Sequence, residues 1–272
     1  MTASIETIGH SRNPEAVADA IALLRDESPD EVRVAILDRY AALAADGPKL
    51  DRGAEVRTSL LIGLRGLTRS TDSTLAEEAT YVYQRSATTK WDVAGNLRAA
   101  GLLLLADLDE PLALFHAARL LVDPATPRMS GQPAITAAQL LRANDQLIVL
   151  YTYVAGGQAD GEIVGECLAG MAGVPEHIAR DLAERFRDNE NDAVRAGLYD
   201  LLMARADDPW ARGEIEALLR DGLPDPVFGY VTTNIVASRN MPLVAVMEAV
   251  VGASGGLRQR MLREALALLP GH

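Results

Sequence analysis

The residues best suited to metal chemistry lie on two neighbouring predicted helices. Glu162 and Glu166 are spaced i, i+4 on the first helix. His177 and Asp181 have the same spacing on the second. Because such pairs share a helix face, a turn through Gly173 could bring carboxylates and an imidazole together, which suits a divalent cation. The apolar stripe of the second helix, however, leaves His177 and Asp181 on its solvated face. We therefore predict no metal site and no cofactor.

The sequence contains one cysteine that could act as a nucleophile, Cys167. It lies between Val164 and Leu168 in an apolar segment, where a small core residue is expected and a reactive thiol is the alternative. A single cysteine can form neither an intramolecular disulfide nor a cysteine zinc cluster. The sequence also contains no phosphate-binding loop, His-Glu-x-x-His pair or Gly-x-Ser-x-Gly elbow. We therefore predict no catalytic residues.

Binding through arginine and aromatic side chains is the other chemistry that the sequence offers. Residues 51–100 contain seven basic and six acidic residues, whereas residues 151–200 contain four and ten. Arginine beside tyrosine or tryptophan is typical of a phosphate site, a single-strand site or a protein hot spot. Burial of the aromatic rings between helices is the alternative. Segment 52–98 supplies the candidate partner-binding residues, which are Arg65, Arg69, Tyr81, Tyr83, Arg85, Trp91 and Arg98.

The composition restricts the partner and the compartment. Hydrophobic residues reach 49% while aromatic residues reach only 4%, so small and aliphatic side chains must build the core. The net charge of −12 disfavours nucleic acid and leaves a protein as the expected partner. The first residues do not resemble an export signal, and the apolar runs are shorter than the roughly 20 residues that span a bilayer. We therefore predict a cytoplasmic protein that does not bind a membrane.

The spacing of apolar residues predicts helices throughout, because strand-like alternation hardly occurs. Breaks rich in Pro, Gly and Asp cut the chain into segments of ordinary helix length. Asp30, Asp92 and Asp192 are placed to cap helix N-termini. The predicted helices are 14–25, 30–45, 54–69, 73–89, 92–107, 110–122, 132–143, 145–155, 160–172, 175–188, 192–206, 210–220, 226–238, 242–251 and 256–269.

An apolar residue followed by arginine recurs near the start of five predicted helices. The separations are irregular, but units of roughly 30 to 40 residues fit if intermediate copies have lost the arginine. A planar guanidinium could bridge turn carboxylates or carbonyls between successive helix pairs. These repeat arginines are Arg33, Arg57, Arg98, Arg195 and Arg258.

This pattern resembles the HEAT-repeat family, whose helix pairs often carry a turn Asp or Pro followed by Val-Arg and a small residue. The resemblance rests mainly on Asp30, Val32, Arg33 and Ala35, and on Asp192, Val194, Arg195 and Ala196. It implies an all-α fold, a right-handed α-α superhelix of about seven helix pairs that forms one solenoid domain over residues 1–272. An irregular helical bundle is the alternative. The implied function is a non-enzymatic protein-binding scaffold or adaptor.

HEAT-like proteins also include enzymes, which leaves alternatives open. HEAT-like DNA glycosylases set an acidic residue among aromatics on a basic surface, and Trp91-Asp92 in segment 52–98 is the comparable pair. HEAT-like deoxyhypusine hydroxylases hold iron through His-Glu dipeptides, which this sequence lacks. Phycobilin lyase subunits carry similar repeats, but no residue here points to a bilin. The proline-rich loop 123–133, with Arg128 and Met129, is either a partner contact or a long turn.

Overall fold

The computed structural model describes residues 2–46, 49–86, 88–109, 111–126, 130–157, 160–221 and 226–269. Within these ranges every regular element is a helix, apart from one isolated β-bridge between Arg85 and Asp92. The predicted all-α class is therefore confirmed. None of the helices in the described ranges has the length and apolar character needed to cross a membrane.

Contacts along the backbone group the chain into two compact units, residues 1–140 and residues 141–272. The helix α8 (Ala134–Ala143) contains the boundary between them. Each unit is described by itself below. The prediction of one domain over residues 1–272 stays a prediction.

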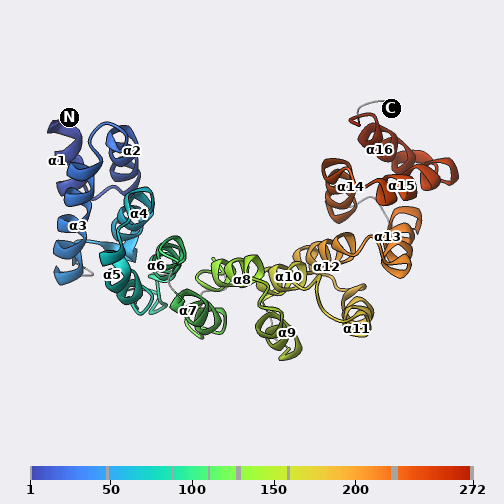
Figure 1. Ribbon diagram of the computed structural model, residues 1–272, viewed down its shortest axis with the longest axis horizontal. Helices are drawn as coiled ribbons and strands as arrows, with labels where there is room; N and C mark the ends of the chain where they lie inside the picture. Colours follow the sequence, from blue (N-terminus) through green and yellow to red (C-terminus); the bar gives the residue numbers. More distant parts are fainter. Residues whose placement is uncertain are drawn as a thin grey trace. The chain divides into compact units, whose positions relative to one another are not determined.

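In the first unit, helices that are two apart in the chain pack on each other (Figure 1). Thus α1 packs on α3, α2 on α4 and α4 on α6, while neighbours such as α5 and α6 also pack together. This alternation places the helices in two layers over a core of leucine, valine, isoleucine and alanine. The helices are α1 (Thr2–His10), α2 (Pro14–Leu24), α3 (Pro29–Asp46), α4 (Glu55–Leu64), α5 (Ser73–Ala79), α6 (Gly95–Asp107) and α7 (Leu112–Leu121).

Helix α2 shows how the local sequence produces these elements. The side chain of Asn13 accepts hydrogen bonds from the backbone N–H groups of Glu15 and Ala16, and Pro14 occupies the first turn, where its missing N–H costs little. Val17 and Ile21, one helical turn apart, then face the core and are buried.

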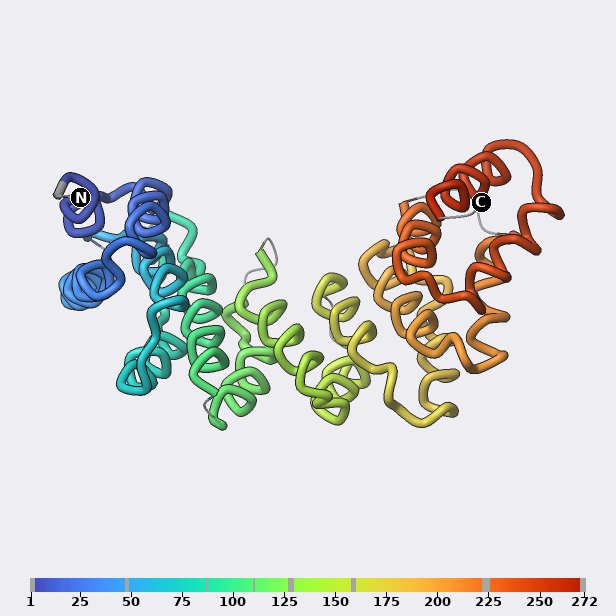
Figure 2. The backbone as a smooth tube through the Cα atoms, turned by 45° about the horizontal axis from the view of Figure 1, so that its top comes forward, coloured from blue at the N-terminus to red at the C-terminus, as the bar shows by residue number. Residues whose placement is uncertain are grey.

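The second unit shows the same alternating packing of helices, and its chain runs from yellow to red in Figure 2. One row consists of α10, α12, α14 and α16, each packed on the next, and α13 packs on α15. The helices are α9 (Leu147–Ala155), α10 (Gly161–Ala169), α11 (Glu176–Phe186), α12 (Asp192–Ala204), α13 (Pro209–Asp221), α14 (Pro226–Ser238), α15 (Met241–Ala253) and α16 (Gly256–Leu266).

Helices α10 and α12 touch backbone to backbone. A methyl group added at Gly197 would overlap the carbonyl of Gly165, and one added at Gly165 would overlap the carbonyl of Ala193. Only glycine permits this approach, because any Cβ atom would push the two helices apart. The pair Gly165 and Gly197 therefore permits the short distance between α10 and α12.

Two predictions about helices are wrong. The predicted helix 73–89 ends already at Ala79, because the chain turns into an irregular segment held by distant arginines. The segment Thr2–His10 forms α1, for which no helix is predicted, because it lacks a strong start signal.

The start signals have different outcomes. Asp192 is the first residue of α12, so its carboxylate lies in the first turn as predicted, and the preceding Asn191 caps the helix by accepting hydrogen bonds from two backbone N–H groups. Asp92 starts no helix, since α6 begins at Gly95. Its carboxylate instead accepts the backbone N–H of Gln84 at 2.8 Å.

Candidate functional site

A small hairpin replaces the predicted end of the helix after Ala79. The backbone N–H of Ser86 donates to the carbonyl of Trp91 at 2.8 Å, and that of Val93 donates to the carbonyl of Gln84, also at 2.8 Å. Together with the β-bridge in this loop, these bonds close it. We call residues 80–93, which connect α5 to α6, the hairpin segment.

Arg98, on α6, anchors the hairpin segment through buried contacts. It is fully buried, and its Nη1 lies 2.7 Å from the Asp92 carboxylate and donates to the carbonyl of Val82 at 2.9 Å. Its Nε lies 3.2 Å from the Asp123 carboxylate, in the turn after α7. The guanidinium carbon is 4.2 Å from the centre of the Tyr83 ring. Arg98 therefore joins the hairpin segment, α6 and the next turn, and it cannot reach a partner.

Arg57, on α4, is a second buried anchor. Its Nε donates to Asp51 at 2.8 Å and its Nη2 donates to the side chain of Gln84 at 2.7 Å. Gln84 in turn donates to the backbone carbonyl of Asp51 at 2.9 Å. The Asp51 carboxylate also accepts the backbone N–H of Val56, so it neutralises the N-terminus of α4. These contacts tie the hairpin segment to the turn before α4.

Three aromatic rings remain exposed on this rigid support. The exposed fractions are 53% for Tyr81, 51% for Tyr83 and 61% for Trp91. Tyr81 stacks on the Arg119 guanidinium, 4.1 Å from the ring centre, and meets His116 edge to face at 5.4 Å. Because these contacts hold the ring of Tyr81, and Arg98 and Asp123 hold that of Tyr83, binding through these two rings would cost little conformational entropy.

A second cluster beside Tyr81 resembles a catalytic triad in its order of groups. The Nδ1 of His116 lies 3.3 Å from the Thr80 hydroxyl, and its Nε2 lies 3.3 Å from the Glu77 carboxylate. Thr80 is fully buried, however, and its hydroxyl donates to the carbonyl of Glu77 at 2.8 Å and accepts from Arg119 at 3.0 Å. The cluster therefore presents no accessible nucleophile and serves to fix the end of α5.

The other predicted binding residues divide into two groups. Arg65 pairs with Asp107 at 2.5 Å in a partly exposed contact, and Arg69 pairs with Asp30 at 2.6 Å in a largely exposed one, so both side chains already have a partner within the first unit. Arg85 is exposed, and no ion pair or hydrogen bond of its side chain occurs within the part of the chain that the structure describes. The hairpin segment therefore gathers Tyr81, Tyr83, Trp91 and Arg85, whereas Arg65 and Arg69 pair elsewhere.

The repeat arginines of the first unit share one arrangement. Like Arg57 and Arg98, Arg33 is buried against a carboxylate, and it donates two hydrogen bonds to Asp72 at 2.7 and 2.6 Å. Burial alone would raise the pKa of Asp72, but the hydrogen bonds from Arg33 and from the Arg69 backbone hold that pKa below its usual value. Each of these arginines thus fastens a turn to a neighbouring helix.

The repeat arginines of the second unit are placed differently. Arg195 lies 3.6 Å from Asp192 on its own helix, and Arg258 donates to the backbone carbonyl of Arg220. Arg205, which is not among the predicted repeat arginines, donates to the carbonyls of two residues in the turn before α11, Ala172 at 2.8 Å and Val174 at 2.7 Å. Its position just before the Asp-Asp-Pro break at residues 207–209 is the signal that could have identified it.

The residues considered for metal and thiol chemistry do not form a site. The described ranges contain no group of three or more His, Cys, Asp or Glu side chains that could hold a metal ion. Glu166 faces Arg142 at 3.9 Å. Cys167 is fully buried, and burial raises the pKa of its thiol to about 12. Of the loop residues considered as a partner contact, Arg128 and Met129 lie outside the described residues.

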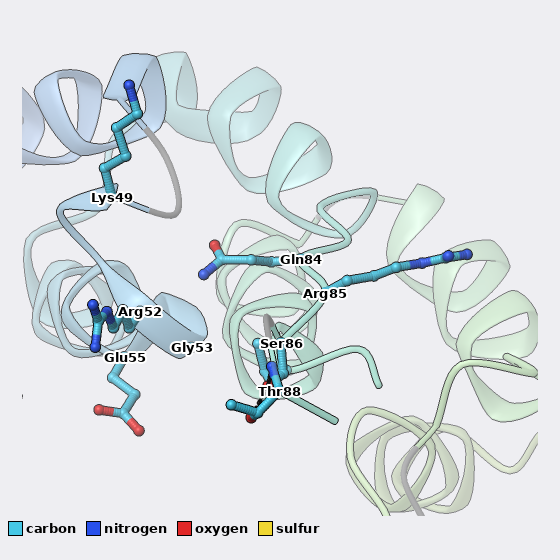
Figure 3. A pocket seen from close by; sticks show the side chains of 9 residues that line it. Lys49, Arg52, Gly53, Glu55, Gln84, Arg85, Ser86 and Thr88 are labelled. Carbon is cyan, nitrogen blue, oxygen red and sulfur yellow. Dashed lines mark hydrogen bonds between the residues drawn. The ribbon is translucent and has the colours of Figure 1, made fainter. Parts of the chain in front are cut away.

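An open pocket of about 840 Å³ lies between the turn before α4 and the hairpin segment (Figure 3). Lys49, Arg52 and Glu55 line it from the turn and α4, and the hairpin segment contributes Arg85 and Thr88, among others. Its volume falls within the range of about 300–1,000 Å³ that is usual for ligand sites. Lys49 and Arg52 could not be predicted from the sequence, because the two walls come from segments about 30 residues apart that the buried Arg57 network brings together.

Comparisons with known protein families, with curated proteins and with solved structures find no match to this chain.

Proposed function

We propose that this chain is a HEAT-like α-solenoid that acts as a cytoplasmic, non-enzymatic scaffold and binds a protein partner through the hairpin segment. The alternating helix packing within each unit supports the solenoid, because each helix pair buries its apolar face against the next pair. The buried arginines that fasten turns to neighbouring helices, such as Arg33 and Arg98, support the same interpretation.

The observation that carries the binding function is the exposure of Tyr81, Tyr83 and Trp91 on a segment fixed by buried ion pairs. Tyrosine, tryptophan and arginine are the residues most often found at the energetic centre of protein interfaces. The alternative of a DNA glycosylase has less support, because the carboxylate of Asp92 already accepts a backbone N–H and faces Arg98.

The test is affinity purification from the native cell with quantitative mass spectrometry. The double variant Tyr81→Ala/Trp91→Ala removes two exposed rings of the hairpin segment. The control, Ile148→Ala/Tyr151→Ala, removes exposed apolar surface from α9 in the other unit. Since truncating an interface hot spot costs at least about tenfold in affinity, the first variant should lose a partner that the wild type and the control retain. Equal recovery of every partner by all three proteins would refute the proposal.

A further inference from the structure

Cations outnumber carboxylates among the described residues that line the pocket beside the hairpin segment. Lys49, Arg52 and Arg85 line it, and Glu55 is the one acidic residue among the described lining residues. Within the described ranges, no ion pair or hydrogen bond engages the side chains of these three cations. The pocket therefore carries a positive local charge in a protein whose net charge is −12.

Five other arginines of the first unit lie beside carboxylates. Arg33, Arg57, Arg65, Arg69 and Arg98 each lie within 3.2 Å of a carboxylate. A chain with an excess of acidic residues can pair its cations easily, and the first unit does so at these five positions. Cations left unpaired around one opening therefore mark a place where an external anion can bind.

Another pocket shows the contrast. It is an open pocket of about 490 Å³ beside α11 and α13, and two arginines line it. Arg187 pairs with Glu214 at 2.8 Å, and Arg180 pairs with Glu176 at 2.7 Å. Internal carboxylates thus neutralise this cavity, whereas the pocket beside the hairpin segment keeps its charge.

The backbone holds both walls of the charged pocket in position. Gly53 and Ala54 have left-handed φ angles of 77° and 56°, and this turn lets Asp51 fold back onto α4 while Arg52 projects outward. On the other wall, the hydroxyls of Ser86 and Thr88 lie 3.0 Å apart at the tip of the hairpin segment. A left-handed conformation at a residue other than glycine costs free energy, so the surrounding contacts must impose it.

We propose that this pocket binds an acidic peptide segment of the protein partner, an inference that rests on the proposed scaffold function. Figure 3 shows that the side chains of Lys49, Arg52 and Arg85 point in different directions, Arg85 away from the other two, and do not converge on one point. Such a spread suits carboxylates spaced along an extended chain better than one compact ion. Most of the described lining residues are charged or polar, and Val93 is the one aliphatic side chain among them.

The net charge of −12 does not prevent this binding. At physiological ionic strength, screening limits interactions between exposed charges to about 8 Å. A peptide in the pocket therefore senses Lys49, Arg52 and Arg85 more strongly than the acidic residues at a greater distance. Lower salt extends the range of both the local attraction and the general repulsion.

The experiment measures fluorescence anisotropy of a labelled peptide of alternating Glu and Ser, beside the same peptide with Gln in place of Glu. Three solvent-exposed charge contacts together are worth about tenfold in Kd, so the wild type should prefer the Glu peptide by about that factor. The triple variant Lys49→Ala/Arg52→Ala/Arg85→Ala should lose the preference. The control Arg239→Ala/Arg260→Ala/Arg263→Ala removes the same charge from exposed positions of the second unit and should keep it.

Several results would overturn the inference. These are equal binding of the two peptides by the wild type, and equal loss of the preference in both triple variants, which would indicate general electrostatics. Tighter binding of a single-stranded oligonucleotide at the same three residues would assign the pocket to nucleic acid. Competition by inorganic phosphate at low concentration would assign it to a compact anion.

The same triple variants separate this inference from the proposed scaffold function. A partner that is lost on Tyr81→Ala/Trp91→Ala but retained at wild-type levels by the pocket variant would leave the scaffold proposal standing and refute the acidic segment. If the pocket prefers the Glu peptide but no partner depends on Tyr81 and Trp91, the scaffold proposal is refuted and the preference of the pocket for acidic peptide remains.

Discussion

Replacing Arg98 by methionine should destabilise the first unit strongly, because it leaves two buried carboxylates without a cation. The side chains of Asp92 and Asp123 are only 6% and 1% exposed, and Arg98 is fully buried. Breaking a buried ion pair by removing one partner costs about 3–5 kcal/mol. The same substitution at Arg65, whose pair with Asp107 is partly exposed, should cost about 1 kcal/mol or less.

Hydrogen–deuterium exchange with mass spectrometry suits this measurement, because it reports each unit separately. For Arg98→Met, amides of α6 should exchange about a hundred to several thousand times faster than in the wild type, since each 1.4 kcal/mol is tenfold. Amides of α12, in the second unit, should not change and provide an internal reference. The hairpin segment should also lose protection, because the carbonyl of Val82 loses its donor.

A neutral replacement of the whole group tests the cause of the loss. The triple variant Arg98→Met/Asp92→Asn/Asp123→Asn removes the cation and both anions, so it should recover much of the protection that Arg98→Met loses. The reasoning is refuted if Arg98→Met accelerates exchange in α6 by less than about tenfold, or by no more than Arg65→Met does.

Two further predictions concern the second unit. Gly197→Ala should lower the free energy of unfolding by at least about 2 kcal/mol in urea denaturation, because a methyl group has no room against Gly165. Gly213→Ala, on an open face of α13, should raise the free energy of unfolding by up to about 1 kcal/mol. Changes of the same sign in both variants would contradict this packing argument. Burial raises the pKa of Cys167 to about 12, so the folded state keeps the proton that the unfolded state releases above about pH 9, and stability should fall between pH 9 and 12 by up to about 1.4 kcal/mol per pH unit from this group. The variant Cys167→Ala should show a flatter dependence, and a wild-type slope equal to that of the variant would be the contrary result.

Helices that depend on local signals could be predicted from the sequence. The predicted helix 226–238 coincides with α14, where Pro226 opens the helix and an apolar stripe defines its buried face. Boundaries failed where a more distant contact decides the conformation. Tyr81-Val82-Tyr83 has the alternation and residue types of an extended chain, but so short a run cannot be told from a helix end without Arg98 and Arg57.

The site could be predicted only in part, because sequence does not show which charges are paired. Arg85 and Arg98 both lie near the aromatic residues, yet one is exposed and the other is fully buried. The partners that decide this lie far along the chain, as with Arg33 and Asp72, which are 39 residues apart. Tyr81 and Trp91 could be proposed as binding residues from their residue types. Their exposure depends on the hairpin segment, which no local sequence pattern predicts.

The pairing of charges also changes what the net charge of −12 implies about partners. A buried pair such as Arg57 and Asp51 is neutral to its surroundings, and its main effect is to fix one turn geometry, since other geometries would leave a charge buried and unpaired. The arginines in such pairs do not contribute to the electrostatic potential at the surface, although they still count in the net charge. The field that a partner meets within about 8 Å is therefore set by unpaired groups such as Lys49 and Arg52. An acidic protein can on this basis select an acidic segment, provided that its paired arginines hold the unpaired ones around a single opening.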